Sequence, residues 1–331
     1  MDGREIRVGD ALIYGAGDKD ASFIEEWMSD SPYIVAHTSG STGRPKEIRL
    51  LKSDMITSAR ATNRFFSIGR DSQMVLPLST DYIAGKMMVV RAIEAGASLW
   101  IEQPSSTPLS AESPERIDLM PIVPSQIAGL LASANVNKVA NVIIGGSPLS
   151  PENESMVVAS GLRAFVTYGM TETCSHVALR RVGNDGYYTP LSGYEIAKDE
   201  RECLVINSAR MSFGSLITND IVEIAADGRF RLLGRYDNVI NSGGVKIHPE
   251  VDERLIGSVV DGMRYYIASH KSEKWGEEPI LVLEGVANPE IEVAILEKCR
   301  ALLPKYHAPK FVVWVDEMDL TDSGKIRRKK F

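Results

Sequence analysis

The order of short apolar runs and helix-like segments constrains the fold of this 331-residue chain more than any other feature. Between about residues 30 and 200, apolar runs that end in Gly or Pro alternate with longer segments of helical character. The runs are YIVA, MVLPL, ASLWIE, LMPIV, NVIIGG and RAFVTYG. Strands that alternate with helices indicate a largely parallel, doubly wound α/β sheet, where ligands bind beyond the carboxyl ends of the strands.

Three helices are predicted between these runs. The first is SDMITSARATNRFFSI, in which Ser53 is the expected N-cap, while Ile56, Ala59 and Phe66 share one face. PSQIAGLLASA and SPENESMVVASG are the second and third helix candidates.

After about residue 200 the pattern changes to strands and tight turns. ECLVIN and VEIAADGRFRLLGR read as strands, and Asp227 and Gly228 suit a hairpin turn. Pro249 opens a helix, and the remaining segments have the order β, β, α, β, which is enough for a compact α+β domain. We therefore expect a large α/β domain with a β-rich portion at residues 1–236 and a small mobile α+β domain at residues 237–331.

Composition excludes several classes of protein. The chain is 44% hydrophobic and 24% charged with a net charge of -7, which describes a soluble globular protein that does not bind nucleic acid. No apolar run reaches the roughly 20 residues of a membrane helix, and MDGREIRVGD lacks the layout of a signal peptide. We expect a cytoplasmic protein with no membrane insertion.

Two further features complete the composition. The cysteines at positions 174, 203 and 299 are odd in number and widely spaced, so reduced thiols are expected rather than a disulfide framework or a zinc site. The basic run KIRRKKF at residues 325–331 is typical of a solvated tail.

The loop TSGSTGRPK has the composition of a phosphate-binding loop but not the common spacing. In the nucleotide-triphosphatase pattern G-x-x-x-x-G-K-[ST], a lysine directly follows the second glycine. Here Gly40 is followed by Gly43, and Lys46 comes only after Arg44 and Pro45. The backbone N–H groups, the hydroxyls and Lys46 still suit a polyphosphate. A mobile surface turn is the other interpretation of so much Gly and Ser.

Five motifs, in order, resemble those of the adenylate-forming superfamily of acyl-CoA synthetases, peptide-synthetase adenylation domains and luciferases. TSGSTGRPK resembles its signature T-S-G-[ST]-T-G-x-P-K. GGSPL at 145–149 resembles the adenine-side loop, and YGMTE at 168–172 the adenylate-binding turn. GRYDNVINSGG at 234–244 resembles the hinge, and DSGKIRR at 322–328 the C-terminal lysine motif.

The resemblance implies a ligase that joins a small-molecule carboxylic acid to AMP, releases pyrophosphate, and passes the acyl group to coenzyme A. The implied cofactors are ATP, Mg²⁺ and coenzyme A. Lys325 would bridge the carboxylate and the α-phosphate, where charge neutralisation and alignment dominate catalysis. Asp237 would be the hinge that withdraws Lys325 and presents Gly243 and Gly244 as a channel for the pantetheine arm.

The resemblance also implies the nucleotide contacts. Lys46 and the loop hydroxyls would hold the β and γ phosphates, Thr171 the α-phosphate, and Glu172 the magnesium ion. Tyr168 would stack on adenine, and Asp220 would accept the ribose hydroxyls. The full implied set is Thr38, Ser39, Gly40, Ser41, Thr42, Gly43, Lys46, Gly145, Gly146, Ser147, Tyr168, Gly169, Met170, Asp220 and Arg235, with Thr171 and Glu172 beside Lys325 as catalytic residues.

Several positions depart from the family pattern. Asn219 replaces a glycine in TND, and Asn241 replaces the hinge lysine. LPLSTDYIAGK stands where the family often has LPLFH, so Tyr82 is the expected gating aromatic residue. Only 37 residues precede the loop, far fewer than is usual in the family. A wall of the pocket or the coenzyme A surface is then expected from elsewhere, as in a homo-oligomer.

Two segments are similar to o-succinylbenzoate-CoA ligases of menaquinone synthesis, where T-E-T-C-S-Q is familiar: YGMTETCSHVALRRV and INSGGVKIHPEVDE. That acid carries two carboxylates, so a cation is needed for the one that does not react. Lys86 and Arg91 are the candidates, with Ser175 and His176 as polar lining. A surface salt bridge for Arg91 and a packed polar role for His176 are equally open. A ligase for another aryl or fatty acid and a non-catalytic nucleotide-binding protein are the alternative functions.

Overall fold

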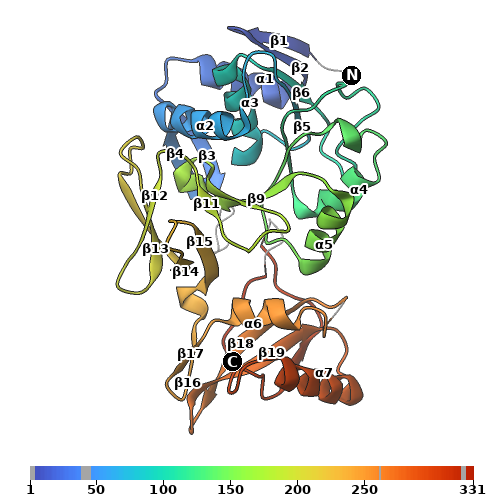
Figure 1. Cartoon of the computed structure of the whole chain (residues 1–331), viewed down its shortest axis with the longest axis vertical. Coiled ribbons are helices and arrows are strands. Elements are labelled where there is room, and N and C mark those ends of the chain that lie inside the picture. Colours follow the sequence, from blue (N-terminus) through green and yellow to red (C-terminus); the bar gives the residue numbers. More distant parts are fainter. Residues whose placement is uncertain (1–3, 39–45, 261, 322–325) are drawn as a thin grey trace. The chain divides into compact units, whose positions relative to one another are not determined.

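The structure is a computed structural model that describes residues 4–38, 46–260, 262–321 and 326–331. The described chain divides into two compact units, coloured from blue to yellow and from yellow to red in Figure 1. Unit 1 comprises Met1–Ile196, Ile206–Leu216 and Ala226–Arg229. Unit 2 comprises Ala197–Val205, Ile217–Ala225 and Phe230–Phe331.

Unit 1 begins with a four-stranded sheet in the order β1-β2-β6-β5, in which β1 is antiparallel to β2 and the other pairs are parallel. Helices α1, α2 and α3 gather beside it (Figure 1). Asp20 caps the N-terminus of α1, because its carboxylate accepts a hydrogen bond from the N–H of Gly17 at 2.9 Å. The bounds are β1 Arg4–Val8, β2 Ala11–Ala16, β5 Gln73–Leu76, β6 Ser98–Ile101, α1 Asp18–Met28, α2 Lys52–Phe66 and α3 Ile83–Ala95.

Helix α3 is apolar around most of its circumference and is correspondingly buried, from Met87 to Ala92. Gly85 permits its close approach to the preceding loop, because a Cβ there would lie 2.2 Å from the carbonyl oxygen of Ser79. Gly96, at φ +65°, ends the helix in the left-handed conformation. This helix was not predicted from the sequence, and neither were β1, β2 and α1.

The second sheet of unit 1 has the order β11-β10-β9-β8-β7. Strands β7, β8 and β9 are parallel, β10 and β11 are antiparallel, and β7 and β8 are buried at every residue, as parallel strands between helices require. The bounds are β7 Met120–Ile122, β8 Val142–Ile144, β9 Ala164–Gly169, β10 His176–Arg181, β11 Thr189–Pro190, α4 Ile127–Leu131 and α5 Pro151–Ser160.

A third, two-stranded sheet in unit 1 pairs β3 (Tyr33–Thr38) with β4 (Lys46–Leu51), antiparallel. A fourth sheet follows, in the order β12-β13-β14-β15, and the division between the units runs through it. Gly228, at φ +81°, forms the predicted turn between β14 and β15. The bounds are β12 Glu195–Lys198, β13 Cys203–Asn207, β14 Ser215–Ile224 and β15 Phe230–Arg235.

The C-terminal part of unit 2 is a sheet in the order β17-β16-β19-β18, with β20 parallel to β19. Alternating residues of β18 and β19 face two cores: Ile267 and Leu281 pack with α6 and α7, while Tyr266 and Ile280 pack with Met318. The bounds are β16 Ile240–Ser242, β17 Val245–Ile247, β18 Tyr265–Ser272, β19 Gly276–Glu284, β20 Val312–Val315, α6 Pro249–Ile256 and α7 Pro289–Leu302.

The predicted fold class is confirmed, including the parallel sheets, the β-rich portion and the α+β C-terminal part. Two details are wrong. Helix α2 begins at Lys52 after Leu51, so Ser53 is not its N-cap. The basic tail is not simply solvated, because the N–H of Phe331 donates to the carbonyl of Ser269 at 3.0 Å. The predicted domains, 1–236 and 237–331, stay a prediction beside the contact-based units.

Two findings on the described residues complete the fold. No helix among them is long and apolar enough to cross a membrane. The cysteines at 174, 203 and 299 are free and buried.

Candidate functional site

The predicted phosphate loop lies between β3 and β4. Thr38 ends β3 and Lys46 begins β4, and their backbones are paired. Ser39, Gly40, Ser41, Thr42 and Gly43 lie outside the described residues, as do Lys325 and the side chains of Thr38 and Lys46. Their predicted roles in phosphate binding and catalysis therefore stay predictions.

The predicted adenine-side loop follows β8, at the carboxyl end of a parallel strand. The N–H of Gly145 donates to the carbonyl of Ile122 at 3.1 Å. A Cβ on Gly145 would lie 2.7 Å from the Oγ1 of Thr167, and Gly146 has φ +89°. Glycine at position 145 thus permits the close approach of this loop to β9, and Ser147 is half-buried.

The predicted adenylate turn follows the neighbouring strand β9, so the two loops lie at the same edge of the sheet. The 3-10 turn Thr171–Thr173 is fastened by Thr173, whose Oγ1 accepts from the N–H of Met170 at 3.0 Å. The turn leaves Thr171 half-buried and Glu172 exposed. An exposed carboxylate at the carboxyl ends of two parallel strands suits a hard cation such as Mg²⁺.

The strand that precedes this turn carries Tyr168 in the core. Its side chain is 8% exposed, and its ring lies edge-on to that of Tyr188, with centroids 5.9 Å apart. Gly169 follows at a point where a Cβ would lie 2.3 Å from the carbonyl oxygen of Ser175. Residue 169 must therefore be glycine for the turn and the start of β10 to approach so closely.

A buried polar cluster adjoins the turn through Ser175. Arg91 of α3 is 1% exposed, and its Nη2 donates to the Oγ of Ser175 at 2.6 Å. His176 is 5% exposed, with its Nδ1 3.3 Å from the same Oγ and its Nε2 3.0 Å from the Oγ1 of Thr62. Of the two interpretations left open for Arg91, the surface salt bridge is wrong, because the all-round apolar helix α3 buries this position.

Burial dominates the electrostatics of the cluster. It lowers the pKa of Arg91 to about 9, so the guanidinium stays charged at neutral pH. The pKa of His176 lies well below its usual value because of burial and, second, the charge of Arg91. Burial also raises the pKa of the Cys174 thiol and of the Tyr194 phenol to about 12. At neutral pH the cluster therefore holds a buried cation and a neutral imidazole.

The other two predicted acyl-substrate residues lie elsewhere in unit 1. The ammonium of Lys86 is 4.3 Å from the centroid of the Phe23 ring of α1, and burial lowers its pKa. Tyr82, at the start of α3, is 68% exposed. The loop before it is held to α1, since Asp81 accepts from Lys19 at 2.5 Å. Among the predicted acyl-pocket residues, the structure brings Arg91, Ser175 and His176 together and leaves Lys86 apart.

The predicted ribose contacts lie opposite each other in unit 2. Asp220 of β14 and Arg235 of β15 are paired in register, and the Nη1 of Arg235 is 3.0 Å from the Oδ1 of Asp220. Asp237, the predicted hinge, accepts from Asn219 at 3.3 Å and lies 3.6 Å from Arg235. The N–H of Arg235 also donates to Glu250 at 3.4 Å. Asn219 thus takes part in hydrogen bonding that a glycine could not provide.

The predicted channel glycines form the turn between β16 and β17. Gly243 and Gly244 have φ +58° and +86°, which favours glycine at both positions. Gly243 also packs against Trp275, whose ring would lie 2.6 Å from a Cβ at position 243. Its N–H donates to the carbonyl of Trp275 at 2.8 Å.

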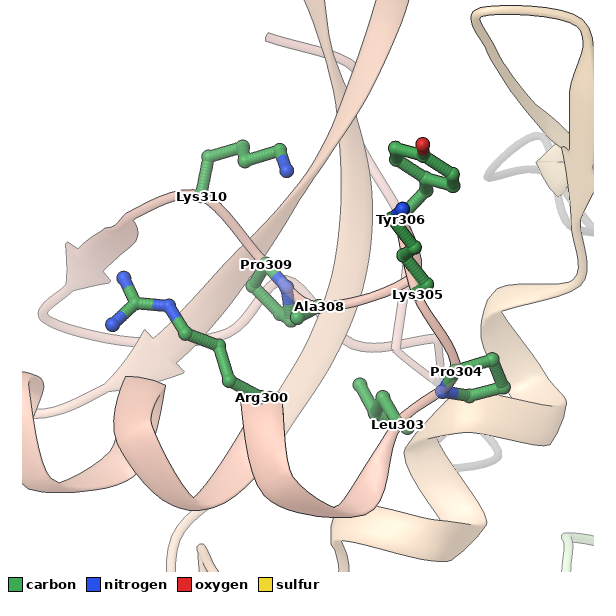
Figure 2. A pocket seen from close by; sticks show the side chains of 8 residues that line it. All are labelled: Arg300, Leu303, Pro304, Lys305, Tyr306, Ala308, Pro309 and Lys310. Carbon is green, nitrogen blue, oxygen red and sulfur yellow. The ribbon is translucent and has the colours of Figure 1, made fainter.

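A basic hollow of about 460 Å³ in unit 2 was not predicted (Figure 2). Tyr306 lines it at φ +77°, a strained conformation for a tyrosine, and its ring lies 6.2 Å from that of Trp275. The signal in the sequence was KYHAPK, where lysines flank an aromatic residue and a proline. The hollow is lined by Arg300, Leu303, Pro304, Lys305, Tyr306, Ala308, Pro309 and Lys310.

The AMP-binding enzyme family model matches residues 6–206. The chain is 25% identical over 338 residues to the indoleacetate–CoA ligase of Aromatoleum aromaticum, covering 90% of this chain and 66% of the relative. It is 24% identical over 340 residues to the 2-succinylbenzoate–CoA ligase of Enterococcus faecalis, covering 91% and 69%. The chain thus spans about two thirds of the length of these curated relatives.

Two solved structures share the fold. An AMP-forming acyl-CoA synthetase/AMP-acid ligase II-like protein from Dyadobacter fermentans is 31% identical, with a TM-score of 0.63 over 92% of this chain and 90% of the other. An o-succinylbenzoate coenzyme A synthetase from Bacillus subtilis, in complex with ATP and magnesium ion, is 19% identical with a TM-score of 0.72. That match covers 89% of this chain and 68% of the other.

Proposed function

This chain belongs to the AMP-binding enzyme family, and we propose that it is an AMP-forming acid–CoA ligase whose acid is o-succinylbenzoate. In the first step a carboxylate oxygen of the acid attacks the α-phosphorus of ATP and pyrophosphate leaves. In the second step the sulfur of coenzyme A attacks the acyl carbon, loses its proton, and AMP leaves. The relatives that carry this activity support the proposal.

One observation carries the choice of a dicarboxylic acid: the guanidinium of Arg91 is buried without a carboxylate partner among the described residues. Burying an uncompensated cation costs free energy, so such a group is kept where an anion arrives from outside. Ser175, which contacts Arg91, packs on Gly169 of the adenylate turn. We infer that Arg91 receives the carboxylate of o-succinylbenzoate that does not react.

The nucleotide would be held at the carboxyl ends of β8 and β9. The backbone of Gly145 and Gly146 would line one side of the base, as the resemblance implies; a Cβ at Gly145 would lie 2.7 Å from the Oγ1 of Thr167, so this position favours glycine. Glu172 would ligate Mg²⁺ together with phosphate oxygens, and Thr171 would donate its hydroxyl to the α-phosphate. When bound, the magnesium ion would neutralise charge on the phosphates and on the leaving pyrophosphate.

Asp220 would hold the ribose, as the resemblance implies, because its carboxylate oxygens can accept from two hydroxyls. Arg235 orients that carboxylate through their 3.0 Å contact. The hydrogen bonds of Asn219 and Glu250 around residues 235–238 make this segment a defined element rather than a loose linker. A hydrogen-bonded segment of this kind supports the proposal that Asp237 is the hinge.

Coenzyme A would use the basic hollow and the glycine turn of unit 2. The hollow presents Arg300, Lys305 and Lys310, and coenzyme A carries three phosphate groups. The exposed ring of Tyr306 offers a stacking surface for its adenine. Trp275 joins the two features, since it contacts Tyr306 and packs on Gly243. The pantetheine arm would then pass over Gly243 and Gly244.

Turnover of ATP and coenzyme A with o-succinylbenzoate, beside benzoate and a medium-chain fatty acid, tests the proposal. We expect acid-dependent release of pyrophosphate with o-succinylbenzoate at the highest kcat/KM. A preference for benzoate or the fatty acid would favour a ligase for another acid. ATP turnover that no acid stimulates would favour a non-catalytic nucleotide-binding protein.

The Lys325→Ala variant tests the two-step scheme. We expect it to lose pyrophosphate release and to keep thioester formation from supplied acyl-adenylate, because Lys325 is proposed to act on the α-phosphate alone. The control is Lys330→Ala, a neighbouring lysine whose side chain is 64% exposed and lies 3.5 Å from Glu277. Equal loss of both half-reactions in Lys325→Ala would contradict the scheme. A cytoplasmic location and a homo-oligomer remain predictions.

A further inference from the structure

The polar groups around Arg91 form a hydrogen-bond chain with a single direction. The Oγ1 of Thr62 lies 3.3 Å from the carbonyl of Ser58 one helical turn earlier, and donates its only hydrogen there. Thr62 must then accept at its other contact, the 3.0 Å hydrogen bond with the Nε2 of His176. The Nε2 of His176 therefore carries the hydrogen.

The rest of the chain follows from this tautomer. In a neutral imidazole with a hydrogen on Nε2, Nδ1 can only accept, so the hydroxyl of Ser175 donates to it across 3.3 Å. The oxygen of Ser175 is left to accept from the Nη2 of Arg91 at 2.6 Å. The chain thus runs from the guanidinium through Ser175, His176 and Thr62 to a main-chain carbonyl of α2, with a donor facing an acceptor at every step.

The chain is sealed from solvent at its centre. Thr62 is fully buried and His176 is 5% exposed. Both ring nitrogens of His176 are engaged, so the imidazole has no group left for a substrate. The Nη1 of Arg91 faces the sulfur of Met88 at 3.4 Å, and its Nε has no hydrogen-bond partner among the described residues. Among the described residues, the only oxygen that accepts a hydrogen bond from the guanidinium is the Oγ of Ser175.

We propose that Ser175, His176 and Thr62 are positioning residues that hold the Arg91 guanidinium in one orientation for the second carboxylate of the acid. The inference rests on the proposed role of Arg91. A guanidinium binds a carboxylate well only when its planar fork faces the two oxygens, and an arginine side chain has many rotamers. The chain removes that freedom before the acid binds, and so favours dicarboxylic over monocarboxylic acids. It assigns His176 an indirect role rather than the predicted role of pocket lining.

Thr62→Val tests the chain, because valine has nearly the shape of threonine but cannot accept from His176. We expect the KM for o-succinylbenzoate to rise about 10-fold, the effect of leaving a buried donor unpaired, while the KM for benzoate changes less than about 2-fold. The control is Thr57→Val on the same helix. Thr57 makes the same kind of bond to a main-chain carbonyl, 2.9 Å to Ser53, and has no contact with His176.

Two variants of His176 separate chemistry from packing. His176→Gln provides an amide oxygen that accepts on one side and an N–H that donates on the other, so we expect it to keep the preference for the diacid. His176→Leu fills the space without either group and should behave as Thr62→Val does. An equal rise in KM for both acids in Thr62→Val and His176→Leu would show a merely structural role and overturn the proposal.

A measurement that needs no activity tests the tautomer. Nitrogen-15 NMR of histidine-labelled protein, with His176→Gln to identify the signal, should show hydrogen on Nε2 and none on Nδ1. A hydrogen on Nδ1 would overturn the chain whether or not the protein turns over any acid. Turnover of no acid with the expected tautomer would contradict the proposed ligase. Turnover with the same loss on both acids would contradict the positioning role alone.

Discussion

Arg91 in unit 1 is buried and Arg328 in unit 2 is half-buried, with a side chain 23% exposed, and the charge of each is compensated differently. Arg328 in unit 2 donates from both Nη atoms to both carboxylate oxygens of Glu253, at 2.6 Å each, and its guanidinium lies over the ring of Tyr266. Arg91 in unit 1 has a hydroxyl and a thioether sulfur instead. Arg328 thus has its counter-ion in the chain, whereas Arg91 has none among the described residues.

The pKa values of the two arginines follow the difference. Burial by itself would lower the pKa of Arg328. The hydrogen bonds to the Glu253 carboxylate and its charge outweigh burial, so the pKa of Arg328 is raised. For Arg91, burial lowers the pKa to about 9, and nothing comparable offsets it. A buried cation with its own carboxylate indicates a structural role, whereas one without indicates a place for an incoming anion. Four experiments test that comparison, from the largest expected effect to the smallest.

Arg328→Met removes the compensated cation and leaves the Glu253 carboxylate, 14% exposed, without its counter-ion. We expect the free energy of unfolding of unit 2 to fall by about 3–5 kcal/mol, the usual cost of breaking a buried pair. Urea denaturation followed by fluorescence would measure it. A loss below about 1 kcal/mol would mean that water reaches Glu253 and that this pair is not structural.

Arg91→Met removes the uncompensated cation. We expect this variant to weaken the binding of the diacid and to leave the stability of the protein nearly unchanged. Because no charged partner is left buried, we expect the free energy of unfolding to change by less than about 1 kcal/mol. The affinity for o-succinylbenzoate should fall by about 2–3 kcal/mol, roughly 30- to 150-fold, since the second carboxylate loses its counter-ion. Calorimetry with o-succinylbenzoate and benzoate would measure both affinities. A stability loss as large as that of Arg328→Met would remove the distinction between the two arginines.

The pH dependence of stability tests the burial of His176, which lies beside Arg91 in unit 1. Its pKa in the folded chain is depressed below 6.5, so below that pH the unfolded chain binds a proton that the folded chain does not. The free energy of unfolding therefore falls with falling pH, by at most about 1.4 kcal/mol per pH unit from this group. His176→Gln should flatten the dependence between about pH 7 and 5 by that amount. Parallel curves for the two proteins would show that His176 titrates normally.

Lys329→Met measures how much an exposed ion pair next to Arg328 contributes to the free energy of unfolding. Lys329 lies 3.5 Å from Asp319, and the two side chains are 66% and 41% exposed. We expect the free energy of unfolding to change by less than about 0.5 kcal/mol, because solvent screens such pairs. The same urea series measures it. A change comparable to that of Arg328→Met would show that the basic tail acts as one network.

The sequence predicted most of the fold because its strands are short apolar runs between turn residues. Strands β7, β8 and β9, the β14–β15 hairpin and helix α7 lie where the patterns placed them. The N-terminal β1, β2 and α1 were not predicted, since they lie outside the motifs on which the resemblance depends. Helix α3 was also not predicted, because a helix that is apolar on nearly all sides has no clear 3.6-residue period.

The candidate site could be predicted only in part. The motifs placed Gly145, Thr171 and Glu172 at one edge of a sheet, as the strand order required. The choice between a surface and a buried Arg91 needed the burial of α3, although the flanking sequence VVRAI was a signal for it. The partners of His176 could not be predicted, because Thr62 is 114 residues away on another helix.

The direction of the hydrogen-bond chain limits how these positions can change in evolution. A side chain at position 176 must accept from Ser175 at one end and donate to Thr62 at the other, which histidine does in one tautomer and glutamine does through its amide. The motif T-E-T-C-S-Q, which this segment resembles, has a glutamine at that place. Exchange between these two residues needs no simultaneous change at position 62 or 175, whereas an aliphatic residue at 176 should be found only together with changes at both.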